Sequence, residues 1–359
     1  MKEKRTVLVA LSGGIDSSFA AYRLIREGYR VIGITMQFYP LDKGRSAETY
    51  LEEKRIADIK KIAENLRIPL YILNLEKDFH DFVIEYFFQE YLSGRTPNPC
   101  IICNQKIKFD TLLNKAREFQ SEYIATGHYI CTGRDEKTGR FTLSKGNDHF
   151  KDQSYFLFLL TQEHLEKAVT PLGQFTKKEV KDYIKYEDFK DYIRPESQEI
   201  CFIQEKNYHN FIKTKSFIKP GNVVDSEGRV LGRHKGIPFY TIGQRRGLGI
   251  SAGSPIYILS IDEKENTIIV GREQGLYKKE LIAERVNWVS IEPPKKSFPA
   301  KAKIRYKHRE DDAEITPFGE NNVKVIFNRP QRAITPGQAV VFYKDNLLLG
   351  GGFIKKTAI

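Results

Sequence analysis

The sequence has no long apolar run and few cysteines. No stretch of about 18 consecutive apolar residues occurs, so a membrane-spanning helix is not expected. Residues 1–5 lead directly into an apolar segment without a secretory signal, and we expect a cytoplasmic protein. Four cysteines in 359 residues are too few for a disulfide scaffold, so reduced thiols for chemistry or metal binding are expected. Low-complexity linkers and internal repeats are also missing.

The charge balance favours a polyanionic partner. Lys and Arg number 58 against 46 Asp and Glu, giving a net charge of +12 and a pI near 9.3. Such a balance is typical of nucleic-acid-binding proteins but does not by itself identify one. The length predicts a large core divided among two or three domains.

The chain is organised around residues 7–18, which read VLVALSGGIDSS. An apolar strand leads into a Ser-Gly-Gly turn, and a helical pattern follows as far as Gly28. The glycines and the helix N-terminus present N–H groups to an anion, and the serines add hydroxyl donors. Asp16 would repel that anion unless it held a divalent cation, so the pattern predicts a nucleotide phosphate with Mg²⁺.

This stretch is neither G-x-x-x-x-G-K-[ST] nor G-x-G-x-x-G. It resembles the pyrophosphate loop of the ATP pyrophosphatases, which cut ATP between the α and β phosphates to adenylate a substrate. The resemblance implies ATP and Mg²⁺ as cofactors.

The first 205 residues alternate strand and helix patterns. Strands are expected at 30–35, 69–75 and 122–126, and helices at 46–67, with Ser46 as cap, and 78–92. This alternation predicts the α/β class, a doubly wound parallel sheet with its ligand at the carboxyl ends of the strands. Met36, at one such end, is expected to pack against adenine. Further expectations are a loop at 93–104 before a helix near Gln105, a hairpin at 131–144 and a helical section at 151–186.

Beyond residue 205, short β-rich runs broken by glycine replace the helical pattern, which predicts two small β domains. We expect a catalytic domain at 1–205, a central β-rich domain at 206–280 and a barrel-like RNA-binding domain at 281–359. Residues 301–309 alternate five cations with Ala302, Ile304, Tyr306 and His308. On a single strand the cations would share one face suited to phosphates, although a solvated edge strand would look the same.

Three cysteines form a candidate reactive group. Cys100 and Cys103 make a Cys-x-x-Cys after two prolines, and Cys201 follows in a Glu-Ile-Cys-Phe segment. Such thiols serve redox chemistry, a zinc site, here with His128 as fourth ligand, or an iron–sulfur cluster. Cys131 is isolated, and we expect it to be structural.

Taken in order, seven motifs resemble the bacterial tRNA-specific 2-thiouridylase family over nearly the whole chain. They are SGGIDSS (12–18), GRTPNPCIICN (94–104), ATGHY (125–129), KDQSYFL (151–157), ICFI (200–203), GQRRGLG (243–249) and TPGQ (335–338). The resemblance implies ATP-dependent thiolation of C2 of the wobble uridine in tRNAs for Lys, Glu and Gln. An adenylated uridine would form first, and a sulfur nucleophile would then displace AMP.

The resemblance also assigns roles to residues. Cys201 would carry a persulfide and Cys103 would be the nucleophile that releases its sulfur or closes a disulfide with Cys201. The sulfur donor would be a cysteine desulfurase or a relay protein. ATP would be bound by Ala10, Leu11, Ser12, Gly13, Gly14, Ile15, Asp16, Ser17, Ser18, Met36 and Gly127. The target base would contact Asn98, Pro99 and Cys100, and tRNA would contact His128, Lys151, Asp152, Gln153, Arg305, Tyr306 and Gln338.

One position departs from the family pattern, because many members have Asp where this chain has Cys100. The change removes an acid/base candidate and adds a third thiol. Cys100, Cys103 and Cys201 could then ligate a [4Fe-4S] cluster that receives sulfide, an alternative to the preferred persulfide route. Two other functions stay open here: a small-molecule synthetase or amidotransferase with the same ATP loop, and an RNA-binding protein without catalysis.

Overall fold

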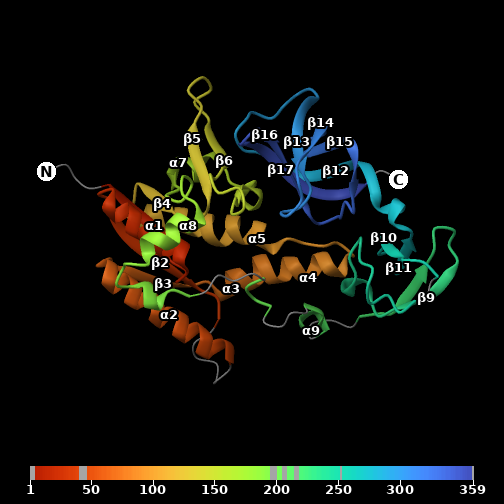
Figure 1. Cartoon of the computed structure of the whole chain (residues 1–359), viewed down its shortest axis with the longest axis horizontal. Coiled ribbons are helices and arrows are strands. Elements are labelled where there is room, and N and C mark those ends of the chain that lie inside the picture. The colour runs from red at the N-terminus through yellow and green to blue at the C-terminus, as the bar shows by residue number, and fades with distance from the viewer. Residues whose placement is uncertain are drawn as a thin grey trace.

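The chain forms a parallel α/β layer at one end and two β structures at the other (Figure 1). This computed structural model describes residues 5–39, 47–194, 200–203, 208–213, 218–250 and 253–357. The expected cap Ser46 and residues 40–45 after Met36 lie outside this part. In the described residues no helix is both long and apolar enough to cross a membrane.

The α/β layer is built on a five-stranded sheet in the order β3-β2-β1-β4-β7, with every pairing parallel. The expected α/β class is therefore confirmed. Strand β7 was not foreseen, because its two residues lie inside the section at 151–186 that was expected to be helical. The strands are β1 (Thr6–Ala10), β2 (Arg30–Gln37), β3 (Leu70–Asn74), β4 (Tyr123–Ala125) and β7 (Ala168–Val169).

Both faces of this sheet are covered, as a doubly wound arrangement requires. Val7 and Val9 of β1 pack into one apolar cluster with side chains of α1, α2 and α8. Leu8, between them, enters the opposite cluster with the long helices that follow β3. The alternation follows from the two-residue period of a strand. On the first face lie α1 (Ile15–Arg26), α2 (Ala47–Leu66) and α8 (Lys177–Ile184).

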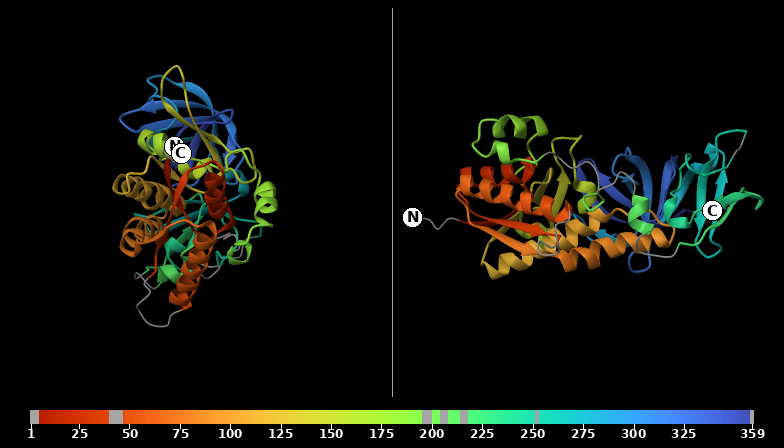
Figure 2. Two further views of the ribbon diagram at one scale, coloured as in Figure 1. Left: turned by 90° about the vertical axis from the view of Figure 1, so that its left-hand side faces the viewer. Right: turned by 90° about the horizontal axis from the view of Figure 1, so that it is seen from below.

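Two long helices extend from the opposite face towards the β structures (Figure 2, right-hand view). One joins α3 (Glu76–Phe79) and α4 (Glu85–Leu92) through a π-helical turn, and the other joins α5 (Pro99–Ile102) and α6 (Asp110–Glu118) through a second. The expected start near Gln105 was wrong, because Pro99 is the first helical residue. Proline is tolerated there, since the first helical N–H has no partner inside the helix. The remaining helices are α7 (Gln162–Lys167) and α9 (Tyr208–Lys213), with π turns at His80–Ile84 and Cys103–Phe109 and 3₁₀ turns at Ser154–Leu157, Lys190–Tyr192, Ile237–Phe239 and Glu273–Leu276.

A four-stranded sheet in the order β10-β11-β8-β9 follows. Only its β11–β8 pairing is parallel. It contains β8 (Gly221–Val224), β9 (Val230–His234), β10 (Tyr257–Asp262) and β11 (Thr267–Gly271).

The C-terminal strands close into a barrel, because β12 pairs with both β15 and β17. The hairpin of β5 (Ile130–Arg134) and β6 (Phe141–Lys145) adds to the same sheet beside β17. A hairpin from the first half of the chain is thus joined to the barrel (Figure 1). The barrel strands are β12 (Tyr277–Trp288), β13 (Phe298–Lys303), β14 (Asp311–Phe318), β15 (Asn322–Arg332), β16 (Ala339–Lys344) and β17 (Leu347–Thr357).

The single basic strand expected at 301–309 is not formed. Strand β13 ends at Lys303, and residues 304–308 form bends and turns, with His308 N–H donating to the carbonyl of Arg305 at 3.0 Å. The five cations therefore do not share one face. Alternation predicts a face only while the backbone stays extended, and here it turns after Lys303.

A turn between β15 and β16 holds the segment that precedes α5. Thr96 N–H donates to the carbonyl of Pro336 at 2.8 Å, and Gln338 Nε2 donates to the carbonyl of Thr96 at 2.8 Å. Gly337 has φ +89°, and a Cβ there would lie 2.9 Å from the Thr96 nitrogen. The barrel and the start of α5 therefore meet backbone against backbone.

This contact predicts a sensitive glycine. Gly337→Ala should lower the free energy of unfolding by about 2–4 kcal/mol, because positive φ and a steric clash both oppose the methyl group. Gly228→Ala is the matched control, since Gly228 has φ +84° but a Cβ there would meet nothing within 4 Å. It should cost only about 1 kcal/mol. Urea denaturation followed by the fluorescence of Trp288, the only tryptophan, measures both, and equal losses would contradict the described contact.

Candidate active site

The crevice lies between β1 and β4, where the order of strands reverses. From β1 the chain moves outward through β2 to β3, whereas β4 and β7 lie on the other side of β1. In open α/β sheets, ligands bind at such a reversal of strand order, at the carboxyl ends of the strands. The Ser-Gly-Gly turn follows β1, and Gly127 follows β4.

The loop at 11–18 is held by its own serines. Ser17 Oγ accepts from Ser12 N–H at 3.1 Å, and the hydroxyls of Ser17 and Ser18 both donate to the carbonyl of Gly14 at 3.0 Å. Gly13 has φ +81°, and a Cβ there would lie 3.0 Å from Ile59 of α2. Gly14 is the N-cap of α1 and, in the described residues, no side chain caps that helix. Among the described residues, no capping side chain therefore occupies the first N–H groups of α1.

Asp16 is the acidic centre of this loop. Tyr129 donates its hydroxyl to Asp16 Oδ1 at 2.7 Å. Lys177 Nζ lies 2.6 and 2.7 Å from the two carboxylate oxygens, although 161 residues separate the pair. Both partners come from segments that border the crevice, after β4 and at the start of α8.

Gly127 closes the other side of the loop. A Cβ at this position would lie 2.7 Å from both the Asp16 carbonyl carbon and the Ser17 nitrogen, so only glycine fits. Arg194 approaches from a third segment, donating its N–H to the carbonyl of Gly13 at 3.0 Å. Met36, at the end of β2, is buried in an apolar cluster. The structure thus brings together Gly127 and residues 10–18, with Met36 at the end of the adjacent strand.

The base-contact candidates lie at the start of the second long helix. Asn98 precedes α5, Pro99 is buried in its first turn and Cys100 is exposed beside it. Thr96 and Pro97 are fixed to the barrel by Gln338, whose Nε2 lies 2.8 Å from the Thr96 carbonyl and 3.4 Å from that of Pro97.

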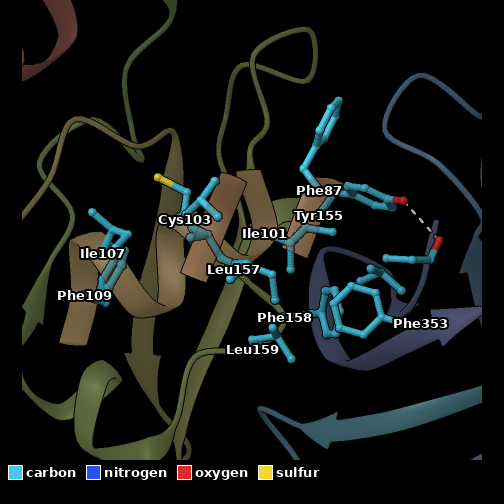
Figure 3. Close-up of a cluster of buried hydrophobic side chains, with 14 of the residues drawn as sticks. Phe87, Ile101, Cys103, Ile107, Phe109, Tyr155, Leu157, Phe158, Leu159 and Phe353 are labelled. Carbon is cyan, nitrogen blue, oxygen red and sulfur yellow. Dashed lines mark hydrogen bonds between the residues drawn. The ribbon is translucent and has the colours of Figure 1, made fainter. Parts of the chain in front are cut away.

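The thiols occupy different environments, and all four cysteines are unpaired. Cys103 lies at the edge of a buried apolar cluster, with its sulfur directed away from Leu157 and Phe158 (Figure 3). Cys201 is exposed, and the next side chain, Phe202, packs edge-on against Phe87 with ring centroids 5.2 Å apart. Phe202 therefore anchors the segment that carries Cys201.

Although the residues Cys100 and Cys201 are exposed and only Cys103 is buried, the protein atoms around each of the three sulfurs make these thiols weak acids. These atoms raise the pKa of Cys103 to about 12 and that of Cys201 to about 11, and they also raise the pKa of Cys100. The charge of Lys108 acts in the opposite direction on the pKa of all three. One cation therefore favours the reactive thiolate form at each sulfur.

The described residues do not offer a ready metal site. No group of three or more His, Cys, Asp or Glu side chains among them could hold a metal ion, and all three candidate cysteines belong to this part. His128 is buried, and its Nδ1 lies 2.7 Å from Thr126 Oγ1. The residues as arranged therefore fit neither the [4Fe-4S] alternative nor the zinc alternative.

Several expected RNA contacts have partners within the chain. His128 stacks on Phe109 with centroids 6.0 Å apart, and burial lowers its pKa well below the usual value, with the charge of Lys108 adding to the effect. Asp152 is buried, its carboxylate accepts from the N–H and hydroxyl of Ser154, and burial raises its pKa. Lys151 is half-buried next to it.

The other expected RNA contacts brace backbone or aromatic groups. Gln153 accepts from Tyr129 N–H at 3.0 Å. Arg305 donates to the carbonyls of Arg332 at 3.0 Å and Ala333 at 3.3 Å. Tyr306 packs on Phe156 with centroids 4.5 Å apart. Their contacts with RNA, like those of Gln338, stay predictions.

Sequence reasoning missed Lys108 and Lys177. Lys108 could have been found had the helix been started at Pro99, since Cys100, Asn104 and Lys108 then recur every four residues. Lys108 Nζ donates to Asn104 Oδ1 at 2.8 Å, as that spacing predicts. For Lys177 the sequence carries no signal, because only the fold brings α8 to the loop after β1.

Three family models match the chain in succession. They describe a tRNA methyl transferase HUP domain at residues 5–205, a tRNA methyl transferase PRC-barrel domain at 209–272 and an aminomethyltransferase beta-barrel domain at 278–354. The first alone covers more than half of the chain.

Relatives that match over nearly their whole length share one name, tRNA-specific 2-thiouridylase MnmA. A tRNA-specific 2-thiouridylase MnmA 1 from Caldanaerobacter subterraneus subsp. tengcongensis is 48% identical, with 99% of each chain covered. MnmA from Acetivibrio thermocellus is 45% identical and MnmA from Clostridioides difficile 44%, each match covering 98% of this chain and 99% of the relative. The chain therefore belongs to the family of tRNA-specific 2-thiouridylases named MnmA.

Proposed function

We propose that this protein is a tRNA-uridine 2-sulfurtransferase, which uses ATP to convert the wobble uridine of tRNAs for Lys, Glu and Gln to 2-thiouridine, with AMP and pyrophosphate as products. The observation that carries the proposal is the match to 2-thiouridylases at 44–48% identity over 98–99% of the chain. A small-molecule synthetase is not supported, because the match includes the barrel as well as the ATP loop.

The first step is adenylation of the base. The C2 carbonyl of uracil is a poor electrophile, so its oxygen must first become part of a good leaving group. In the proposed step O2 attacks the α-phosphorus of ATP, a P–O bond to the β-phosphate breaks and pyrophosphate leaves. Residues 11–18 and Gly127 would bind the nucleotide, and Mg²⁺ arriving with ATP would bind Asp16.

The second step transfers sulfur. A desulfurase or relay protein would load Cys201 with a persulfide, whose outer sulfur attacks C2 while AMP departs with the original oxygen. Cys103 then attacks the Cys201 sulfur, closing a disulfide and releasing 2-thiouridine. An external dithiol must reduce that disulfide before the next turnover.

Base access depends on a flipped nucleotide. The wobble base has to leave the anticodon stack to reach a pocket, as base-modifying enzymes require. Asn98, Pro99 and Cys100 would contact it at the start of α5. The tRNA contacts proposed for His128, Lys151, Asp152, Gln153, Arg305, Tyr306 and Gln338 include several residues that brace this site from within.

Thiolation itself is the first test. Unmodified tRNA for Lys, ATP, Mg²⁺, a dithiol reductant and a cysteine desulfurase with cysteine as its substrate should yield tRNA that is retarded on a mercury-containing gel. Cys201→Ser should abolish retardation when a desulfurase supplies sulfur, because the persulfide has no carrier. Cys131→Ser is the matched control and should keep activity near that of the wild type. Retardation without ATP, or full activity of Cys201→Ser with the desulfurase, would contradict the proposal.

The thiol acidities make a second prediction. Alkylation of Cys201 by iodoacetamide should keep rising above pH 9 towards its pKa of about 11, since only the thiolate reacts. Lys108→Met should slow the reaction at pH 8.5 by roughly three- to tenfold, because loss of the positive charge raises the pKa further. Lys106→Met is the control, since Lys106 is paired with Asp110 at 3.2 Å. Peptide mass spectrometry measures the extent of alkylation at each cysteine. A Cys201 alkylation rate that reaches its plateau below pH 8 would refute the environment assigned to this thiol.

A further inference from the structure

In the proposed mechanism Cys201 receives its sulfur from another protein, so the surface beside this thiol has to fit that protein. Cys201 is exposed, and the segment that carries it is held by Phe202. The ring of Phe202 packs edge-on against Phe87, with centroids 5.2 Å apart, and against Phe79 at 5.8 Å. Both of these rings belong to the long helix formed by α3, the π turn at His80–Ile84 and α4. A donor protein that reaches Cys201 therefore comes close to this helix.

The two sides of this helix differ in exposure. Phe79, Val83 and Phe87 are spaced four residues apart, are buried and form the inner side. Phe82 lies within the π turn and is 46% exposed, although a residue three positions after Phe79 would normally follow the buried side of an α-helix. π turns are frequent at functional sites, and aromatic rings are typical anchors of protein interfaces. One exposed ring does not by itself identify a surface, so the charges around it decide.

The charge around Phe82 is opposite to that of the chain. Residues 76–90 contain five acidic residues, one lysine and no arginine, whereas the whole chain carries a net charge of +12. Asp78 and Asp81 precede Phe82 on this helix and are exposed. The one lysine, Lys77, is paired with Asp81 at 3.1 Å. The outer side of the helix therefore repels tRNA phosphates and attracts a basic protein surface.

The proposed reaction needs two macromolecular partners, tRNA and a sulfur donor, and the acidic charge of this surface favours the second. We propose that the outer side of the helix, with Asp78, Asp81 and Phe82, is the docking surface of the protein that loads Cys201. This partner carries a persulfide and presents a basic surface with an apolar pocket for Phe82. Because tRNA is repelled from the same surface, the two partners do not compete for it.

The transfer across this interface is a thiol–persulfide exchange. The Cys201 thiolate attacks the outer sulfur of the donor persulfide, the donor S–S bond breaks, and the donor departs as a thiolate while Cys201 becomes the persulfide. The exchange needs neither an oxidant nor a reductant. This inference rests on the proposed function, because it assumes that Cys201 carries the persulfide.

Two sulfur sources separate docking from chemistry. The first is the cysteine desulfurase, with a relay protein if it uses one, supplied with cysteine that carries radioactive sulfur. The second is chemically prepared cysteine persulfide with the same label, which needs no docking. Label on the chain is counted after electrophoresis without reductant, with Cys201→Ser as background. The double variant Asp78→Lys, Asp81→Lys and the single variant Phe82→Ala should each slow loading from the desulfurase about tenfold and leave loading from cysteine persulfide unchanged.

The double variant Glu263→Lys, Glu265→Lys is the matched control. It makes the same change of charge at two exposed residues between β10 and β11, away from α3 in Figure 1, and should load at the wild-type rate from both sources. Wild-type loading of the helix variants by the desulfurase would overturn the inference. Equal slowing with both sources would indicate a structural effect on Cys201, and equal slowing of the control a nonspecific effect of charge, and either result would overturn it too. If neither source supported thiolation by the wild type, the proposed function itself would be wrong.

Discussion

The backbone contact between the turn at 335–338 and residues 95–97 determines where the thiol-bearing helix begins. Two hydrogen bonds of 2.8 Å join Thr96 to Pro336 and Gln338, and the missing side chain of Gly337 allows the approach. Pro99 starts the helix shortly afterwards. The barrel therefore positions Cys100, Cys103 and Lys108, although it contributes no sulfur itself.

The same helix links the thiols to the crevice between β1 and β4. Phe109 stacks on His128, and His128 directly follows the glycine that closes the loop around Asp16. One rigid element is thus fixed by the barrel at its start and by the parallel sheet near its middle. The proposed division of work follows from this geometry, with adenylation in the crevice between β1 and β4 and sulfur transfer along the helix that borders it.

The sequence predicted the parallel sheet well, because apolar strands and amphipathic helices alternate with clear periods. It also predicted the strand, the Ser-Gly-Gly turn and the helix around Asp16, since glycines, serines and Asp16 are adjacent in the chain, whereas nucleotide binding by this loop stays a prediction. The sequence-based prediction was wrong where the local residue pattern does not determine the backbone geometry. The residues from Pro99 were predicted to form a loop but begin a helix, and the basic residues after Lys303 were predicted to continue a strand but form a turn. Lys177 could not be predicted at all, because its partner lies 161 residues away.

The expected RNA contacts illustrate another limit. Arg305 and Gln338 are polar residues of a kind that contacts RNA, yet here they bind backbone carbonyls. Sequence identifies the donor, but only the structure shows which acceptor it has within the chain. A residue that braces the site can still be essential for activity, because a small displacement of a reacting group costs much of the rate.

Adenylation and sulfur transfer are, in the proposed mechanism, separate steps performed by separate groups. The decisive experiment uses Cys201→Ser, unmodified tRNA for Glu and ATP labelled at the α-phosphate, in the absence of any sulfur donor. We expect label to be transferred to tRNA and pyrophosphate to be released, with neither product formed by Asp16→Asn. If Cys201→Ser failed to label tRNA while the wild type did so under the same conditions, the two steps could not be separate.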